Sequence, residues 1–173
     1  MPNTFRKTGV RAPEIVLKGG CLCGHVRFEA KGKPGKAHTC SCSMCQKHSG
    51  AITVAWVEYP KAAVSWTGPL GSPALFRSSA KSRRAFCPEC GSTIGAVDDT
   101  PTVGLVAGAF DKPLPDDAAP HAHVHAKSAP EWWHVETAGV PLRRDGGNGN
   151  GNGKAGARRN GKSRQCKGTS SRG

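Results

Sequence analysis

Seven of the eight cysteines lie in three short clusters, and clustered cysteine thiolates are typical ligands of zinc in proteins. The clusters are Cys21-x-Cys23, Cys40-x-Cys42-x-x-Cys45 and Cys87-x-x-Cys90, and the remaining cysteine is Cys166. A Cys-x-x-Cys turn holds two sulfur atoms on one side of a tight loop, and a Cys-x-Cys pair on an extended segment directs both side chains to one face. The spacing therefore predicts metal binding.

The odd number of clustered cysteines divides into a group of four and a group of three. One tetrahedral zinc ion takes four thiolates, so seven cysteines leave three for a second ion. We assign the first ion to the first and last clusters: Cys21, Cys23, Cys87 and Cys90. We assign the second ion to the middle cluster: Cys40, Cys42 and Cys45. Because structural zinc sites are closed and catalytic ones keep an open position, this count predicts one structural and one reactive ion.

Other interpretations of the histidines and cysteines are open at the level of sequence. A histidine such as His38 or His48 could close the second site, which would make both ions structural. Disulfide bonds are a weaker alternative, because the chain is expected to stay in a reducing compartment. His121, His123 and His125 alternate and could share one face of a strand, but the stretch also fits an exposed strand face, and we expect no third metal.

Charge is concentrated toward the C-terminus. The formal net charge is +13, and residues 143–173 hold nine of the 25 basic residues against a single acidic one, Asp145. Their Gly- and Asn-rich composition predicts a disordered basic tail over 146–173. The tail could attract nucleic acid through charge alone, but it has no aromatic residues for base stacking. A solubilising tail is therefore the favoured interpretation.

No apolar run in the sequence is long enough to span a membrane. The N-terminus also has no apolar segment followed by a small-residue cleavage site. We therefore expect a cytoplasmic protein whose cysteines stay reduced.

Short strands between Gly and Pro turns are the elements that must position the cysteines. Residues 25–30 alternate apolar and polar side chains with a period of two, as a half-buried strand does. Further strands are predicted at 15–17, 52–57, 63–67, 74–78, 102–107 and 121–127. Residues 43–48 could form one helical turn. These signals predict a loop-rich, mostly β domain with little helix over 19–145, after a polar lead-in at 1–18.

Three motifs resemble the family of the glutathione-dependent formaldehyde-activating enzymes, which is grouped with centromere protein V. They are Gly-Gly-Cys-Leu-Cys-Gly at 19–24, Cys-Ser-Cys-Ser-Met-Cys-Gln-Lys-His-Ser-Gly at 40–50, and Phe-Cys-Pro-Glu-Cys-Gly-Ser at 86–92. The resemblance implies antiparallel sheets of the β-tent kind and two zinc ions per chain, with four thiolates for a structural ion and three for a catalytic one. It also implies the chemistry of an S-(hydroxymethyl)glutathione synthase, which is a carbon–sulfur lyase.

The chemistry that these residues would support begins with a thiol such as glutathione, activated as a thiolate at the open zinc position. The thiolate would add to a small aldehyde such as formaldehyde, and the resulting oxyanion needs a proton or a positive partner. Lys47 and His48 are the nearest candidates for that role, although each also fits a solvent-exposed turn residue. Basic side chains near the third cluster could receive substrate carboxylates: Arg77, Lys81, Arg83 and Arg84. The rival function is a zinc-stabilised binding module without catalysis.

Overall fold

The computed structural model describes residues 15–135, and within them ten strands form two sheets. The smaller sheet has the order β1-β2-β5, and the larger one has the order β10-β3-β4-β9-β8-β7-β6. The strands are β1 Val16–Gly20, β2 Arg27–Lys31, β3 Gly35–Cys40, β4 Val54–Pro60, β5 Val64–Trp66, β6 Ala74–Arg77, β7 Ser82–Phe86, β8 Thr93–Asp98, β9 Thr102–Val106 and β10 His123–Val124. Neighbouring strands are antiparallel except β10 and β3, which are parallel. The mostly β, largely antiparallel fold predicted from the sequence is confirmed.

Within residues 15–135, helical structure is confined to short segments, as predicted. The α-helix α1 spans Ser43–Ser49, and the 3-10 helices are η1 Lys61–Ala63, η2 Ala107–Ala109, η3 Asp116–Ala118 and η4 Ala126–Ser128. Helix α1 ends at Gly50, whose φ of 71° favours glycine and whose N–H donates to the Gln46 carbonyl. Among the described residues, no helix has the length and apolar character that crossing a membrane requires.

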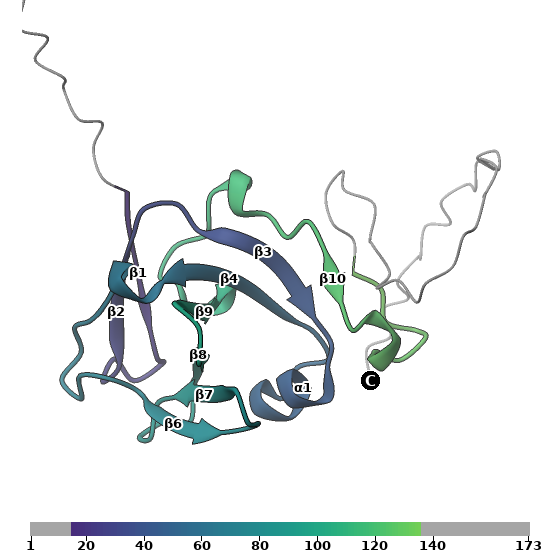
Figure 1. The fold of residues 1–173 in the computed structure, drawn as a ribbon, viewed down its shortest axis with the longest axis horizontal. Coiled ribbons are helices and arrows are strands. Elements are labelled where there is room, and N and C mark those ends of the chain that lie inside the picture. Colours follow the sequence, from purple (N-terminus) through teal and green to yellow (C-terminus); the bar gives the residue numbers. More distant parts are fainter. Residues whose placement is uncertain (1–14, 136–173) are drawn as a thin grey trace, which may run out of the picture.

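The large sheet curves from β10 and β3 at one end to β7 and β6 at the other, and α1 lies inside the curve (Figure 1). Its core is built from side chains that are fully buried, such as Tyr59, Ile94 and Leu105. Phe28 of the small sheet joins this core by packing edge-to-face against Phe110, with the ring centroids 5.1 Å apart. The two sheets therefore share one apolar interior.

A close approach of the backbone fixes the residue type at Gly19, two positions before the first cysteine. A Cβ atom at Gly19 would collide with the Ala109 carbonyl oxygen and the Phe28 ring. Only glycine lets β1 pass this point, so the loop that carries Cys21 starts from a tightly defined position. Strand β1 begins at Val16, within the strand predicted at 15–17, and continues to Gly20.

The histidine-rich stretch differs from the prediction of one long strand at 121–127. Only His123 and Val124 form a strand, and their partners on β3 are Thr39 and Cys40. His123 is buried whereas His121 and His125 are exposed, so the three histidines do not share one exposed face. His125 has a φ of 54°, which ends the alternation of side chains there. The predicted tail at 146–173 and Cys166 lie outside the described residues.

Candidate metal centres and the adjoining cavity

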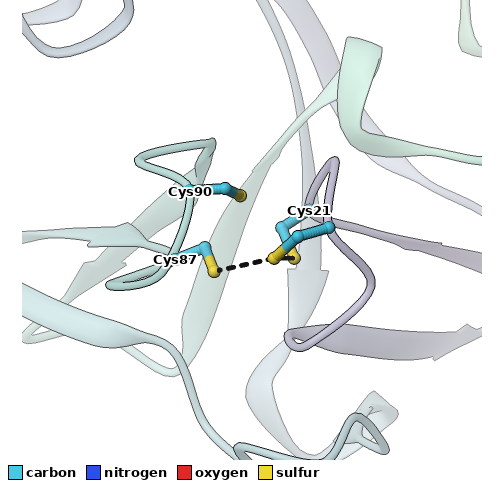
Figure 2. A group of neighbouring side chains, drawn as sticks. Cys21, Cys87 and Cys90 are labelled. Carbon is cyan, nitrogen blue, oxygen red and sulfur yellow. Dashed lines mark hydrogen bonds between the residues drawn. The ribbon is translucent and has the colours of Figure 1, made fainter.

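Four cysteines from two distant loops meet between the β1–β2 turn and the β7–β8 turn. The sulfur atoms of Cys21, Cys23, Cys87 and Cys90 all lie within 4.8 Å of one another. The Cys21 and Cys23 sulfurs are 3.4 Å apart, and the Cys23 and Cys87 sulfurs are 3.7 Å apart. Figure 2 shows Cys21 on one loop facing Cys87 and Cys90 on the other. These are the four residues that the sequence analysis assigned to one ion.

Backbone and hydroxyl groups hold this four-cysteine group in place. The Val26 N–H donates to the Cys21 sulfur at 3.2 Å, and the Leu22 N–H donates to the Ser92 hydroxyl at 3.1 Å. Ser92 also lies 3.2 Å from the Cys90 sulfur, so it links both loops. Hydrogen bonds with Ser92 lower the pKa of Cys90 to about 5. Four close thiols with one readily ionised member form a donor set that fits zinc.

The second group of cysteines comes from one continuous segment. Cys40 ends β3, Cys42 caps the N-terminus of α1, and Cys45 lies on the first turn of the helix. Their sulfur atoms lie within 4.8 Å of one another, and the Cys45 N–H donates to the Cys42 sulfur at 3.4 Å. The strand-to-helix turn therefore brings together the three residues assigned to the second ion. All seven clustered cysteines are free thiols, so none is committed to a disulfide bond.

The three thiols hold their protons unequally. Hydrogen bonding with Cys40 and Cys42, together with the positive charge of Arg84, lowers the pKa of Cys45 to about 5. The pKa of Cys40 is raised because it shares a hydrogen bond with Cys45 and is buried. A soft, partly anionic set of three sulfur atoms fits zinc and leaves one tetrahedral position for another ligand.

A chain of hydrogen bonds that runs from the buried Ser41 to the surface supports the turn between Cys40 and Cys42. The Ser41 hydroxyl is 2.8 Å from the His123 Nε2 atom and 2.6 Å from the Thr53 hydroxyl. The Trp133 indole N–H then donates to the Thr53 hydroxyl at 2.8 Å. Sequence reasoning missed this network, because its members lie far apart in the chain and only the alternation of the histidines hinted at a strand there.

A cavity of about 330 Å³ opens beside the three-cysteine group, at the lower end of the size range of ligand pockets. It crosses the adjacent strands β4, β9, β8 and β7. In the sheet register, Arg84 of β7 is opposite Ala96 of β8, and Ala96 is opposite Gly104 of β9. Gly104 is in turn opposite Glu58 of β4. The methyl group of Ala96 is small and Gly104 has no side chain, so the space above these strands is open. Glu58 and Asp98 also line the cavity.

Arg84 brings a positive charge into this cavity. It is only 7% exposed, its NH1 atom lies 3.8 Å from the Cys45 sulfur, and its guanidinium lies over the Trp56 ring at 5.7 Å from the centroid. Arg77 and Arg83 instead form ion pairs with Asp99 at 3.3 Å, and Lys81 is exposed. Of the four basic residues considered for substrate carboxylates, Arg84 is the one that lines the cavity.

Lys47 and His48 lie on α1 but do not line this cavity. Lys47 is exposed. His48 is half-buried and lines a separate hollow with Cys21 and Cys90, and burial followed by the charge of Arg84 lowers its pKa. Its backbone carbonyl accepts a hydrogen bond from Thr93. His38 lines the cavity, and its Nδ1 atom is 2.8 Å from the Lys36 carbonyl oxygen.

A family model and a curated relative both match this chain. The family model described as "Glutathione-dependent formaldehyde-activating enzyme" matches residues 16–128. A protein of Halomonas elongata, named provisionally as a glutathione-dependent formaldehyde-activating enzyme, is 26% identical over 139 residues, which are 71% of this chain and 83% of that protein. A crystal structure of a Rhodobacter sphaeroides protein aligns with a TM-score of 0.47 and 20% identity, over 58% of this chain and 94% of that one. The family match spans both cysteine groups.

Proposed function

This chain belongs to the glutathione-dependent formaldehyde-activating enzyme family, and we propose that it is a zinc-dependent enzyme joining a thiol to a small aldehyde. The proposed substrates are glutathione or a similar thiol and formaldehyde, and the reaction class is that of a carbon–sulfur lyase. The observation that carries the proposal is a group of three thiols, rather than four, that opens on a ligand-sized cavity. A purely structural zinc site would be closed by a fourth protein ligand.

Two zinc ions per chain are part of the proposal. The structural ion would be held by Cys21, Cys23, Cys87 and Cys90, and the catalytic ion by Cys40, Cys42 and Cys45. When bound at the three-cysteine group, zinc lowers the pKa of a thiol that ligates it, so that the thiolate is present at neutral pH. Three thiolate ligands favour a soft sulfur substrate over water as the fourth ligand.

The protein's own residues would hold the thiol and the aldehyde together in the cavity. Trp56 is 5% exposed and forms part of the apolar wall, and Gly104 leaves room beside it. Holding both reactants in one small site replaces a chance encounter by an oriented one. The substrate sulfur forms a bond to the carbonyl carbon, the C=O π electrons move to oxygen, and the oxygen then takes a proton from solvent. The thiol has released one proton, so the addition is balanced.

The proposed activity is tested by mixing the zinc-loaded protein with glutathione and ¹³C-formaldehyde. We expect exchange between free formaldehyde and the S-hydroxymethyl adduct to be faster than the spontaneous background in two-dimensional NMR exchange spectra. Cys42→Ser should remove the acceleration while the four-cysteine group keeps its zinc. A wild-type exchange rate equal to the background, with both ions bound, would contradict the proposal and favour a zinc-stabilised binding module.

A further inference from the structure

We propose that Arg84 is a catalytic residue that binds the aldehyde oxygen as it becomes an alkoxide. This inference rests on the proposed addition of a thiol to an aldehyde and names a group that would stabilise its transition state. Lys47 and His48, the candidates suggested by sequence proximity, do not line the cavity beside the three cysteines. Arg84 does, and its guanidinium touches the Cys45 sulfur.

Arg84 lacks a carboxylate partner among the described residues. Arg84 is 7% exposed, yet it forms no ion pair with any acidic residue of the described part of the chain. Its neighbour Arg83, one position earlier on β7, is paired with Asp99. The anionic group that Arg84 does contact is the Cys45 sulfur, which is also a proposed zinc ligand, so part of the Arg84 charge is available to an anion that arrives from elsewhere.

The Arg84 guanidinium also has N–H donor capacity that no group among the described residues uses. A guanidinium carries five N–H donors in a fixed plane. The NH1 atom of Arg84 contacts the Cys45 sulfur, and its Nε atom has no hydrogen-bond partner among the described residues. The Trp56 ring lies against the guanidinium and orients it, which makes Trp56 a positioning residue. Arg84 is thus held in place with hydrogen-bonding capacity to spare.

The position of Arg84 next to Cys45 favours binding of the alkoxide over binding of a substrate carboxylate. In the adduct, the new oxygen is two bonds from the sulfur that attacked, so it forms next to the Cys45 sulfur that Arg84 touches. The carboxylates of glutathione lie farther from its sulfur. Glu58, which is ion-paired with Lys36, and Asp98 also line the cavity, and the Asp98 carboxylate would repel the carboxylates of glutathione. Stabilising developing negative charge with a preorganised donor is among the largest contributions to catalysis.

The test compares Arg84→Lys and Arg84→Met with a matched control, Arg83→Met, in zinc-loaded protein. With glutathione and formaldehyde, we expect Arg84→Met to lower kcat about 100-fold, a typical loss for an oxyanion donor, with little change in the KM for the thiol. Arg84→Lys keeps the charge but loses the planar fork, so its kcat should fall by an intermediate factor. Arg83→Met should stay within about twofold of wild type, because losing an exposed ion pair has a small effect.

Repeating the measurement with 2-mercaptoethanol distinguishes binding of the alkoxide by Arg84 from binding of a glutathione carboxylate. Because this thiol has no carboxylate, an equal loss of kcat in Arg84→Met supports the alkoxide assignment. A rise in KM that occurs with glutathione alone would overturn it, as would full activity in both Arg84 variants. Zinc content and melting temperature are measured for each variant.

A binding measurement keeps the inference separate from the proposed function. In ¹⁵N spectra of the zinc-loaded wild-type protein, titration with formate should shift the Arg84 Nε–H signal, identified by its absence in Arg84→Lys. This shift is expected even if the wild-type protein proves unable to accelerate adduct formation, in which case only the proposed function fails. An Arg84 signal that does not respond to formate would overturn the assignment of Arg84 as an anion-binding group.

Discussion

Tyr59, the single tyrosine of the chain, is fully buried, and its hydroxyl has no hydrogen-bond partner among the described residues. Burial raises the pKa of Tyr59 to about 12, because the phenolate form is poorly solvated there. The folded state therefore favours the neutral phenol. Its contribution to stability is complete below the unfolded pKa of about 10 and is lost as the pH rises toward 12.

We predict that Tyr59→Phe removes the loss of unfolding free energy that ionisation of Tyr59 causes at alkaline pH. Between pH 10 and 12, wild type should lose about 2 kcal/mol of unfolding free energy more than the variant does, because two pKa units correspond to roughly that energy. Urea titrations at each pH measure the difference, and tyrosinate absorbance near 295 nm reports on Tyr59 alone. A difference between the two proteins that does not change with pH would contradict the prediction.

At the scale of single residues, the sequence predicted which cysteines meet but not what surrounds them. The division followed from assigning four thiolates to one tetrahedral zinc ion and the contiguous cluster of three to a second; the groups are Cys21, Cys23, Cys87 and Cys90, and Cys40, Cys42 and Cys45. The contact of Arg84 with Cys45 joins residues 39 positions apart. Contacts of this kind depend on strand register, which no local pattern in this sequence specifies.

At the scale of elements, strands β3, β7 and β8 lie outside every predicted range, and β7 and β8 have irregular side-chain patterns for identifiable reasons. Strand β7 carries the buried Arg84 on a face that an alternating pattern would make apolar. Strand β8 contains Gly95, where a Cβ atom would collide with the Gly104 carbonyl oxygen of β9. A cavity and a close backbone approach thus both weaken the sequence signal. Strands β2, β4, β5, β6 and β9 overlap the predicted ranges, with boundaries shifted by a few residues.

The short strand β10 gives a prediction at this scale. His123→Ala removes the imidazole that contacts the Ser41 hydroxyl at 2.8 Å, between two proposed zinc ligands. We expect a loss of about 1–3 kcal/mol in unfolding free energy, since a buried hydroxyl loses a partner. We also expect faster zinc loss from the three-cysteine group, because its supporting turn loosens.

Chelator-induced zinc release followed with a chromogenic indicator measures the effect of His123→Ala. The exposed neighbour His121→Ala serves as the matched control and should release zinc at the wild-type rate. Equal release rates in His123→Ala and wild type would show that β10 does not support the three-cysteine group.

At the scale of the whole molecule, the two cysteine groups connect very different lengths of chain. Cys23 and Cys87 are 64 positions apart, whereas the three-cysteine group lies within one turn from Cys40 to Cys45. A link across 64 positions removes about 2 kcal/mol more chain entropy from the unfolded state than a link across one local turn. The four-cysteine group should therefore carry the larger share of the stability that metal supplies.

We predict that Cys87→Ser and Cys45→Ser have unequal effects. Structural zinc contributes about 10 kcal/mol or more to folding, which is comparable to the whole stability of a domain, so Cys87→Ser should fail to fold. Cys45→Ser should keep its β-sheet circular dichroism and bind one zinc ion instead of two. Metal analysis by mass spectrometry, together with thermal melts, distinguishes the two variants. Similar melting temperatures for both would contradict the assignment of structural and catalytic roles.

The parallel pairing of β10 with β3 has a consequence for the order in which this molecule is made. Chains leave the ribosome from the N-terminus, and early segments can begin to fold while later ones are still being synthesised. All seven clustered cysteines precede residue 91, but His123, which contacts Ser41, follows more than thirty positions later. All seven clustered cysteines are therefore translated well before His123, whose imidazole supports the turn between Cys40 and Cys42. Maturation of the three-cysteine group should thus follow the synthesis of β10, the last strand within the described residues.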